Sequence, residues 1–309
     1  MNGRPFFIVG PTATGKSDLA ADAAHELGGE ILSADAFQIY RGLDVLSAKP
    51  DAQTLARVPH HLIGTVPLDA EMNAEKFRRA AGEVLGEIHS RGRFAIVVGG
   101  SGLYVKALTH GLAPLPEPDP ELRERLNAMS LDELRSRLAQ LDPEAAREID
   151  WKNRRRVMRA LEICLLAGKP ASQVLAGVGD CSRPGSTIPP TGVFVYRDRE
   201  ELYARINERV VRMFEKGVIE EVRAAGRVSG TASQMIGLRE IRQLLEGKMS
   251  IPQCVAAIQQ ATRRYAKRQL TWFRRQTNFS SLNLSHFSHD EAVRWILQRA
   301  ERSFASGDE

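Results

Sequence analysis

The chain has 309 residues, 43% of them hydrophobic and 26% charged, which is enough apolar sequence for one large domain or two modest ones. Its net charge of +5 is mildly basic and does not by itself indicate a nucleic-acid partner. The three cysteines are scattered and form no C-x-x-C pair, which argues against a zinc finger and a disulfide framework. There is no signal-peptide pattern and no apolar run of membrane-spanning length, so we expect a cytoplasmic protein with no membrane partner.

The first motif lies between a predicted strand at residues 6–9 and a predicted helix at residues 18–27. It fits the phosphate-loop pattern G-x-x-x-x-G-K-[ST] at every fixed position. Its residues are Gly10, Pro11, Thr12, Ala13, Thr14, Gly15, Lys16 and Ser17. Loop amides and a helix N-terminus can hold an anion, Lys16 adds a positive charge, and Ser17 can hold a Mg²⁺ ion. The pattern therefore predicts a phosphate site without specifying the phosphate.

Asp35 is the acid we expect nearest to this loop. It ends a second predicted strand at residues 30–35, and ligands of open α/β sheets gather at the carboxyl ends of the strands. The alternative is a turn acid that caps a helix, and the residues alone favour neither. A third predicted strand at residues 93–98 is followed by Gly99 and Gly100, not by the acid that handles Mg²⁺ in ordinary phosphate-loop NTPases. This difference weakens the prediction of an ATPase.

Two adjacent histidines, His60 and His61, precede a predicted helix at residues 74–91. Paired histidines suggest a metal site, but adjacent side chains on a strand or turn point apart. Because no second cluster of His or Cys accompanies them, we favour a structural role for both.

A proline-rich break at residues 112–120 is typical of a hinge or linker. An amphipathic helix is predicted at residues 121–140, and another helix begins within residues 150–159 and ends near Gly168. A second break at residues 182–190 follows, with no convincing strand in between. We therefore predict an α/β fold. It has a P-loop NTPase-like parallel-sheet core at residues 1–113 and 192–309, and a helical insertion domain at residues 114–191.

A strand at residues 193–196 returns the chain to the sheet and leads into a long helix. Asp198 and Glu201 have the spacing of a capping box at the start of that helix. Arg205, Arg209 and Arg212 share one helix face because they lie at i, i+4 and i+7. A solvated basic stripe is the ordinary explanation, but the position after a core strand favours one arginine reaching the phosphates.

The last clear helix, at residues 254–276, is strongly basic, and its second half contains no acid. Tyr265, Trp272 and Phe273 are interleaved with the cations. Like charge combined with aromatic side chains is typical of a surface that binds a nucleic-acid backbone. The alternatives are a solvated face and aromatics that pack in the core; the unbroken positive charge favours nucleic acid.

Together these motifs resemble one family almost from end to end, the bacterial tRNA dimethylallyltransferases. The matching segments are residues 10–17, 35–40, 42–44, 48–50, 60–62, 99–104, 159–162, 267–269 and 271–274. The combination is specific, whereas the phosphate loop alone would not be. Three residues depart from the family pattern: Ala36 replaces a usual Ser, Ser101 a usual Thr, and Leu238 a common aromatic. Ala36 lacks a hydroxyl beside Asp35, which argues against a proton relay through that position.

The resemblance implies a reaction and a set of site residues. The loop would hold the diphosphate of dimethylallyl diphosphate, with Thr12, Lys16 and Arg209 stabilising the leaving group and Ser17 binding Mg²⁺. Asp35 would take a proton from the exocyclic N6 amine of a flipped adenosine, which lies beside the anticodon in tRNAs reading codons that begin with U. We expect a monomer. By their match to family positions, the residues expected to contact the tRNA anticodon loop are Asp35, Ala36, Phe37, Gln38, Ser101, Arg123, Arg155, Arg156, Val157, Met158, Arg159, Gln234, Met235, Ile236, Gly237, Leu238 and Arg239.

Three other functions remain open at this point. A small-molecule phosphate-loop kinase would use the helical insertion as a lid and would consume ATP. An adenylate isopentenyltransferase would perform the same transfer on a free nucleotide, and the basic helices argue for tRNA instead. A non-catalytic RNA-binding module would bind no diphosphate, and the intact Lys16, Ser17 and Asp35 argue against it.

Overall fold

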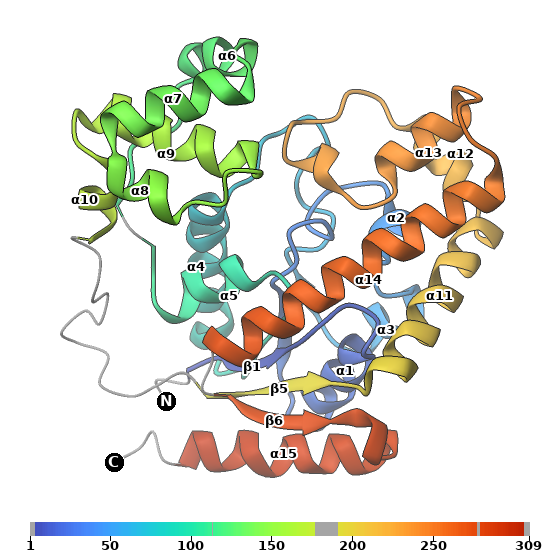
Figure 1. Ribbon diagram of the computed structural model, residues 1–309. Coiled ribbons are helices and arrows are strands. Elements are labelled where there is room, and N and C mark those ends of the chain that lie inside the picture. Colours follow the sequence, from blue (N-terminus) through green and yellow to red (C-terminus); the bar gives the residue numbers. More distant parts are fainter. Residues whose placement is uncertain (1–3, 113, 177–190, 277–278, 306–309) are drawn as a thin grey trace. The chain divides into compact units, whose positions relative to one another are not determined.

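The computed structural model describes residues 4–112, 114–176, 191–276 and 279–305 (Figure 1). The chain forms two compact units, Met1–Thr109 with Ile188–Glu309, and His110–Thr187. The first unit contains a sheet of six strands, and every neighbouring pair is parallel. The strands are β1 (Phe6–Val9), β2 (Glu30–Ser33), β3 (His60–His61), β4 (Ala95–Gly99), β5 (Gly192–Tyr196) and β6 (Ser280–Asn283). Their spatial order is β3-β2-β4-β1-β5-β6, which confirms the predicted α/β fold with a parallel sheet.

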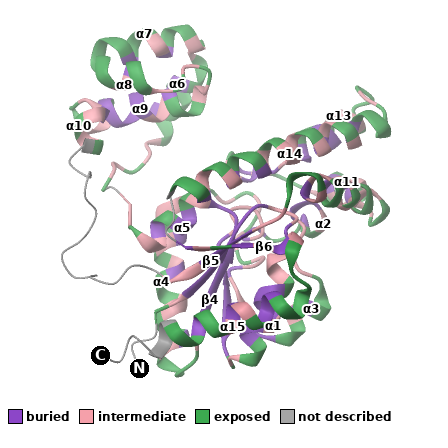
Figure 2. Cartoon of the chain, turned by 60° about the horizontal axis from the view of Figure 1, so that its bottom comes forward, coloured by how far each residue is buried: buried purple, intermediate pink, exposed green. Residues whose placement is uncertain are grey.

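Helices cover both faces of this sheet, which explains why its strands are apolar throughout. Phe6 and Ile8 of β1 pack in a core with α1 (Lys16–Glu26) and α15 (His289–Ala305). Phe7 of β1 faces the other way, into a core with α4 (Ala74–Ser90), α5 (Gly102–Thr109) and α14 (Ile251–Gln276). Figure 2 shows the strands as the buried centre of this unit, between helices whose outer sides are exposed.

A third core of this unit joins several shorter helices to α14. Val210, Val218, Leu238 and Ile258 are among its buried side chains. The remaining helices of the unit are α2 (Asp44–Ser47), α3 (Ala52–Arg57), α11 (Arg199–Glu215), α12 (Val218–Ala224), η1 (Ala232–Gln234), α13 (Leu238–Leu245) and η2 (Leu284–His286). The packing fixes α11 beside the loop that follows β1, with which its arginines form hydrogen bonds.

The second unit is entirely helical among its described residues. Its helices are α6 (Pro120–Ala128), α7 (Leu131–Leu141), α8 (Pro143–Glu148), α9 (Arg154–Ala167) and α10 (Ala171–Ala176). It has its own apolar core, to which Leu134 and Leu161 contribute. Glu162 is buried beside that core and pairs with Arg123 at 2.8 Å and Arg159 at 2.6 Å. The two guanidinium groups compensate a carboxylate that would otherwise be costly to bury.

Two predictions about helices are wrong. The single helix at residues 121–140 is in fact α6 and α7, because Ser130 caps α7 and forms a reciprocal capping box with Glu133. The capping box at the start of α11 does not form either. The carboxylate of Asp198 accepts a hydrogen bond from Asn283 at 2.9 Å, and Glu201 instead binds the Arg197 side chain.

The cysteines form no disulfide within the described part of the chain, where Cys164 and Cys254 are buried free thiols. Burial raises the pKa of the Cys254 thiol to about 11, with a smaller contribution from Glu240. Cys181 lies outside the described residues. No helix among the described residues is both long and apolar enough to cross a membrane.

Candidate functional site

The loop of residues 10–17, called the phosphate loop below, is shaped to hold an anion. Gly15 adopts a φ of +91°, in the left-handed region, and α1 begins at the next residue, Lys16. A Cβ at Gly10 would lie 2.1 Å from the carbonyl oxygen of Val195, so only glycine fits where β1 enters the loop beside β5. The buried Thr14 hydroxyl donates to a carbonyl of the same loop at 3.0 Å. The free amides of the first turn of α1 are therefore presented to a ligand.

Arginines from the end of β5 and from α11 surround this loop. Arg209 donates a hydrogen bond to the Thr12 hydroxyl at 2.9 Å, as expected for an arginine that reaches the phosphates. Arg205 and Arg197 donate to loop carbonyl oxygens, each at 2.9 Å. Arg212 pairs with a glutamate one turn earlier on the exposed side of α11, so it does not join the site. Arg197 was not predicted from the sequence.

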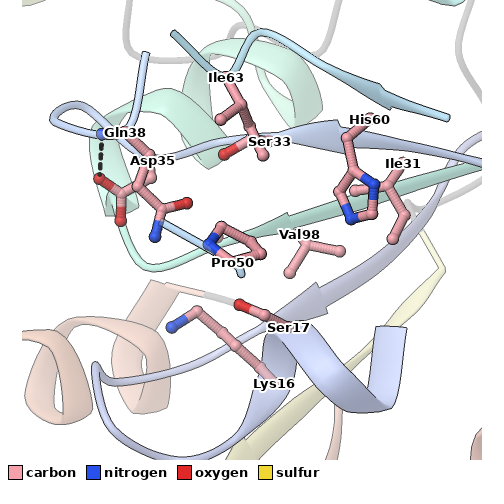
Figure 3. Close-up of a pocket in the computed structure, with 11 residues that line it drawn as sticks. Lys16, Ser17, Ile31, Ser33, Asp35, Gln38, Pro50, His60, Ile63 and Val98 are labelled. Carbon is pink, nitrogen blue, oxygen red and sulfur yellow. Dashed lines mark hydrogen bonds between the residues drawn. The ribbon is translucent and has the colours of Figure 1, made fainter. Parts of the chain in front are cut away.

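Asp35 lies just after β2 and lines the same pocket as Lys16 and Ser17 (Figure 3). Its Oδ1 atom accepts hydrogen bonds from the amides of Phe37 and Gln38, at 2.9 and 3.2 Å. Its Oδ2 atom has no hydrogen-bond partner among the described residues. Both interpretations of this acid therefore hold: it closes a turn, and it presents a free oxygen beside the phosphate loop.

Burial and neighbouring charges together shift the pKa values of the cations of this site. Burial is the main cause that lowers the pKa of Lys16, to about 8; Arg209 lowers it further and Asp35 opposes the shift. Burial also lowers the pKa of Arg209, and Asp35 again opposes it. Lys16 Nζ donates to the carbonyl of Pro11 at 3.2 Å. Two partly desolvated cations facing one carboxylate carry an excess of positive charge, and a bound anion would stabilise them.

The glycine-rich segment after β4 is explained by how closely α14 packs on it. A Cβ at Gly100 would lie 2.3 Å from the side-chain nitrogen of Gln269, and a Cβ at Gly102 would lie 2.5 Å from the Trp272 ring. Gln269 is buried, accepts a hydrogen bond from the Thr12 amide at 3.0 Å and donates to the Gly100 carbonyl at 2.8 Å. Its amide thus joins the phosphate loop to the loop after β4, a role that was not predicted from the sequence.

The loop after β4 also supports the loop that carries Asp35. The amide of Ala36 donates to the Ser101 hydroxyl at 2.9 Å. The tyrosine hydroxyl of Tyr265 on α14 interacts with the Ser101 and Gln269 side chains, and burial raises the pKa of that tyrosine. One chain of contacts therefore connects α14, the phosphate loop and the backbone beside Asp35.

The rest of the pocket extends from Lys16 and Asp35 toward His60 of β3 (Figure 3). Ile31, Ile63, Pro50 and Val98 form apolar walls, and the side chains of Ser33 and His60 add polar groups. The two histidines have separate environments. His61 pairs with Glu30 at 2.7 Å, which agrees with a structural role, whereas His60 lines the pocket.

The described residues contain no group of three or more His, Cys, Asp or Glu that could hold a metal by itself. Mg²⁺ does not require such a group, because it keeps several waters and is commonly bound through one or two protein oxygens and substrate phosphates. The hydroxyl of Ser17 and the carboxylate of Asp35 line one pocket beside the phosphate loop. This oxygen set fits a hydrated Mg²⁺ ion that is shared with a bound diphosphate.

The residues expected to contact RNA fall into two groups. The side chains of Val157, Met235 and Leu238 are buried in apolar cores, so in this structure they present no exposed surface to RNA. Gly237 is buried as well. Ser101 is also buried. Those with exposed side chains are Arg123, Arg155, Arg156, Gln234 and Arg239; Asp35, Ala36, Phe37, Gln38, Met158, Arg159 and Ile236 are partly exposed.

The basic helix α14 has one exposed charged side and one buried side. Phe273 is fully buried and stacks on Phe194 with ring centroids 5.8 Å apart, so its proposed contact with nucleic acid is wrong. Trp272 is partly buried against the segment after β4. The exposed cations of the helix are Arg264, Lys267, Arg268, Arg274 and Arg275. The charge pattern thus forms a surface, whereas the aromatics belong largely to the core.

Comparison with known proteins places this site in a family context. A family model described as IPP transferase matches residues 38–276. The chain is 43% identical over 297 residues to a tRNA dimethylallyltransferase of Geobacter sulfurreducens, covering 94% of this chain and 90% of the relative. It is 42% identical over 272 residues to one of Akkermansia muciniphila, covering 87% and 90%.

Solved structures show the same architecture. The full-length tRNA isopentenylpyrophosphate transferase of Bacillus halodurans has a TM-score of 0.71 and 33% sequence identity, with 100% of both chains covered. A tRNA isopentenylpyrophosphate transferase of Staphylococcus epidermidis has a TM-score of 0.67 and 32% identity, covering 97% of this chain and 99% of its own. These likenesses confirm the predicted P-loop NTPase-like core with a helical insertion.

Proposed function

The chain belongs to the IPP transferase family, and from that premise we propose that it transfers a dimethylallyl group from dimethylallyl diphosphate to tRNA. The acceptor is the exocyclic N6 amine of the adenosine beside the anticodon, and the products are N6-dimethylallyladenosine and diphosphate. The observation that carries the proposal is the meeting of Lys16 and Asp35 in one pocket, with Arg209 bonded to Thr12 at its edge.

The phosphate loop binds the diphosphate of the donor. Negative charge develops on this leaving group as the allylic carbon–oxygen bond breaks, so fixed cations stabilise the transition state more than the ground state. Lys16, Arg209 and the Thr12 hydroxyl are the groups in place for that task. Ser17 would hold a Mg²⁺ ion, which would supply further neutralising charge beside the diphosphate.

Asp35 acts as the general base. Two backbone amides fix its Oδ1 atom, which leaves Oδ2 free to accept a hydrogen bond from the adenine amine. As the nitrogen forms its bond to the allylic carbon, the carbon–oxygen bond to diphosphate breaks and the amine proton passes to the carboxylate. The adenosine must leave the base stack to bring its amine to Asp35 beside the phosphate loop.

The tRNA contacts come from exposed polar and basic side chains of both units. Single-stranded RNA loops are recognised by splayed bases and by cations that contact phosphates. In the first unit these groups are the exposed cations of α14 together with Gln234 and Arg239; in the helical unit they are Arg155 and Arg156. The enzyme works as a monomer, which light scattering at working concentration would test.

A small-molecule kinase is less well supported because Gly99 stands where an NTPase would place its Mg²⁺-handling acid. A Cβ at Gly99 would lie 2.1 Å from the Ala34 carbonyl oxygen, so the sheet leaves no room for that acid. An adenylate isopentenyltransferase would not need the basic surface of α14. Transfer assays with ATP and AMP as alternative substrates distinguish both from the proposed function.

The test is transfer of a labelled dimethylallyl group to unmodified tRNA by the wild-type protein and by Asp35→Asn. The variant keeps an oxygen for the two amides but loses the base, so its turnover should fall by about 10²–10⁴-fold. Its affinity for diphosphate in the absence of Mg²⁺ should not fall, because a negative charge near the site is removed. Near-wild-type turnover of Asp35→Asn would refute the assignment of the base, and transfer to AMP without tRNA would refute the acceptor.

A further inference from the structure

The pocket contains three polar side-chain atoms that form no hydrogen bond with another described residue. Ser17 Oγ, Ser33 Oγ and His60 Nε2 have no hydrogen-bond partner among the described residues, although all three side chains line this pocket. Ser33 is 4% exposed, so its hydroxyl has little access to bulk solvent. Polar atoms in such a place are normally satisfied by bound water or by a ligand.

The protonation of His60 follows from its hydrogen bond with the backbone of Val58. Its Nδ1 atom lies 2.8 Å from the carbonyl oxygen of Val58, and a carbonyl only accepts hydrogen bonds. Nδ1 therefore carries the proton, and Nε2 is left as an acceptor. Figure 3 shows the His60 ring turned into the pocket, on the same side as Ser17 and Val98. Burial lowers the pKa of His60, which keeps the ring neutral at physiological pH.

An acceptor of this kind suits a water molecule that donates strongly. A phosphate oxygen is itself an acceptor and would be repelled by the lone pair of a neutral Nε2 atom. Water bound to Mg²⁺ is polarised by the ion and donates both of its protons, and Mg²⁺ in proteins usually keeps several such waters. The apolar walls of Ile31, Ile63 and Val98 leave His60 and Ser33 as the polar groups of that region.

We propose that His60 and Ser33 are positioning residues for the water shell of the Mg²⁺ ion that Ser17 holds beside the diphosphate. Each accepts a hydrogen bond from a water on the ion and thereby fixes the ion relative to the phosphate loop. This inference rests on the proposed function, since it requires a diphosphate in that loop. It gives His60 a role different from that of His61, which binds Glu30 at the edge of the sheet.

The experiment measures the affinity for inorganic diphosphate by calorimetry, once with saturating Mg²⁺ and once with EDTA. In His60→Asn the side-chain amide can still donate to the Val58 carbonyl, so the fold is retained while the acceptor is lost. Ser33→Ala removes the second acceptor, on a different strand, so the test does not depend on a single variant. His61→Asn is the matched control, because it changes the neighbouring histidine outside the pocket.

We expect each pocket variant to lose on the order of tenfold in affinity with Mg²⁺ and to match the wild type in EDTA. His61→Asn should bind like the wild type in both conditions. An unchanged affinity of both pocket variants with Mg²⁺, an equal loss with and without the ion, or the same loss in His61→Asn would each overturn the inference. If the wild-type protein itself binds no diphosphate, the proposed function fails instead, so the two failures are distinguishable.

Discussion

Lys16 is poised so that diphosphate binding depends on pH. Its pKa in the free protein is about 8, mainly because the ammonium group is buried. A bound diphosphate favours the charged form and raises that pKa, so binding takes up a proton above pH 8. The affinity should therefore fall by up to about one power of ten per pH unit above pH 8. Calorimetry with inorganic diphosphate between pH 7 and pH 10 measures this slope.

Diphosphate also titrates in this range, and Lys16→Ala provides the correction. The variant should bind more weakly at pH 7, and the difference from the wild type should shrink as the pH rises through 8. A difference that stays constant up to pH 10 would contradict the assignment of the slope to Lys16.

Gln269 is a residue whose loss should affect stability and activity together. Gln269→Leu keeps most of the side-chain volume but leaves the Thr12 amide and the Gly100 carbonyl unpaired. An unsatisfied buried group costs about 1–3 kcal/mol, so urea unfolding should show a loss of about 2 kcal/mol or more. Gln259→Leu, on the same helix and with one bond to the Asn207 carbonyl, should cost less. Equal losses in the two variants would refute a special role for Gln269.

The sequence could predict residues whose position follows from a local rule. Lys16 and Ser17 belong to a fixed pattern, and Asp35 follows β2 of the same parallel sheet, so both lie at the carboxyl ends of strands. Gln269 and Arg197 could not be found in this way, because their contacts depend on how α14 and the end of β5 pack against the phosphate loop, which is far from both in the sequence. The turn of the His60 ring into the pocket is likewise a tertiary feature.

At the scale of elements, the approach of α14 to the sheet depends on glycine. Gly102→Ala would place a Cβ 2.5 Å from the Trp272 ring, so α14 or the ring must shift, and we expect a loss of about 1–3 kcal/mol. Gly82→Ala in α4 is the matched control, since nothing lies within 4 Å of its added Cβ. It should gain about 0.5–1 kcal/mol from helix propensity. Thermal and urea unfolding measure both changes; stabilisation of Gly102→Ala would contradict the tight contact.

The two wrong predictions about helices have identifiable causes. The break between α6 and α7 had a signal in the sequence, since Ser130 and Glu133 have capping-box spacing. The amphipathic pattern on both sides concealed it. Asp198 and Glu201 show the opposite case, because the same spacing was present and the side chains bind Asn283 and Arg197 instead. Local capping signals are therefore decided by the partners that the tertiary structure offers.

At the scale of the whole molecule, the position of the positive charge on the surface matters as well as its total amount. The net charge of +5 is modest, yet the cations of α14 lie on one exposed side without intervening acids. Burial explains why this charge is directed outward: Phe273 and Ala266 occupy the opposite side of the helix in apolar cores. A polyanion would therefore meet a continuous basic surface, whereas α15 on the other face of the sheet carries acids as well.

This separation predicts how tRNA binding responds to salt. Each phosphate contact contributes a slope of about −0.7 to −0.9 in the logarithm of affinity against the logarithm of salt concentration. Replacing Arg264 and Lys267 by Ala should therefore reduce the slope by about 1.4–1.8 and weaken binding at low salt. Replacing Arg294 and Arg299 on α15 changes the net charge equally but should leave the slope nearly unchanged. If both pairs reduce the slope alike, binding follows net charge alone, and α14 is not the surface that meets the tRNA.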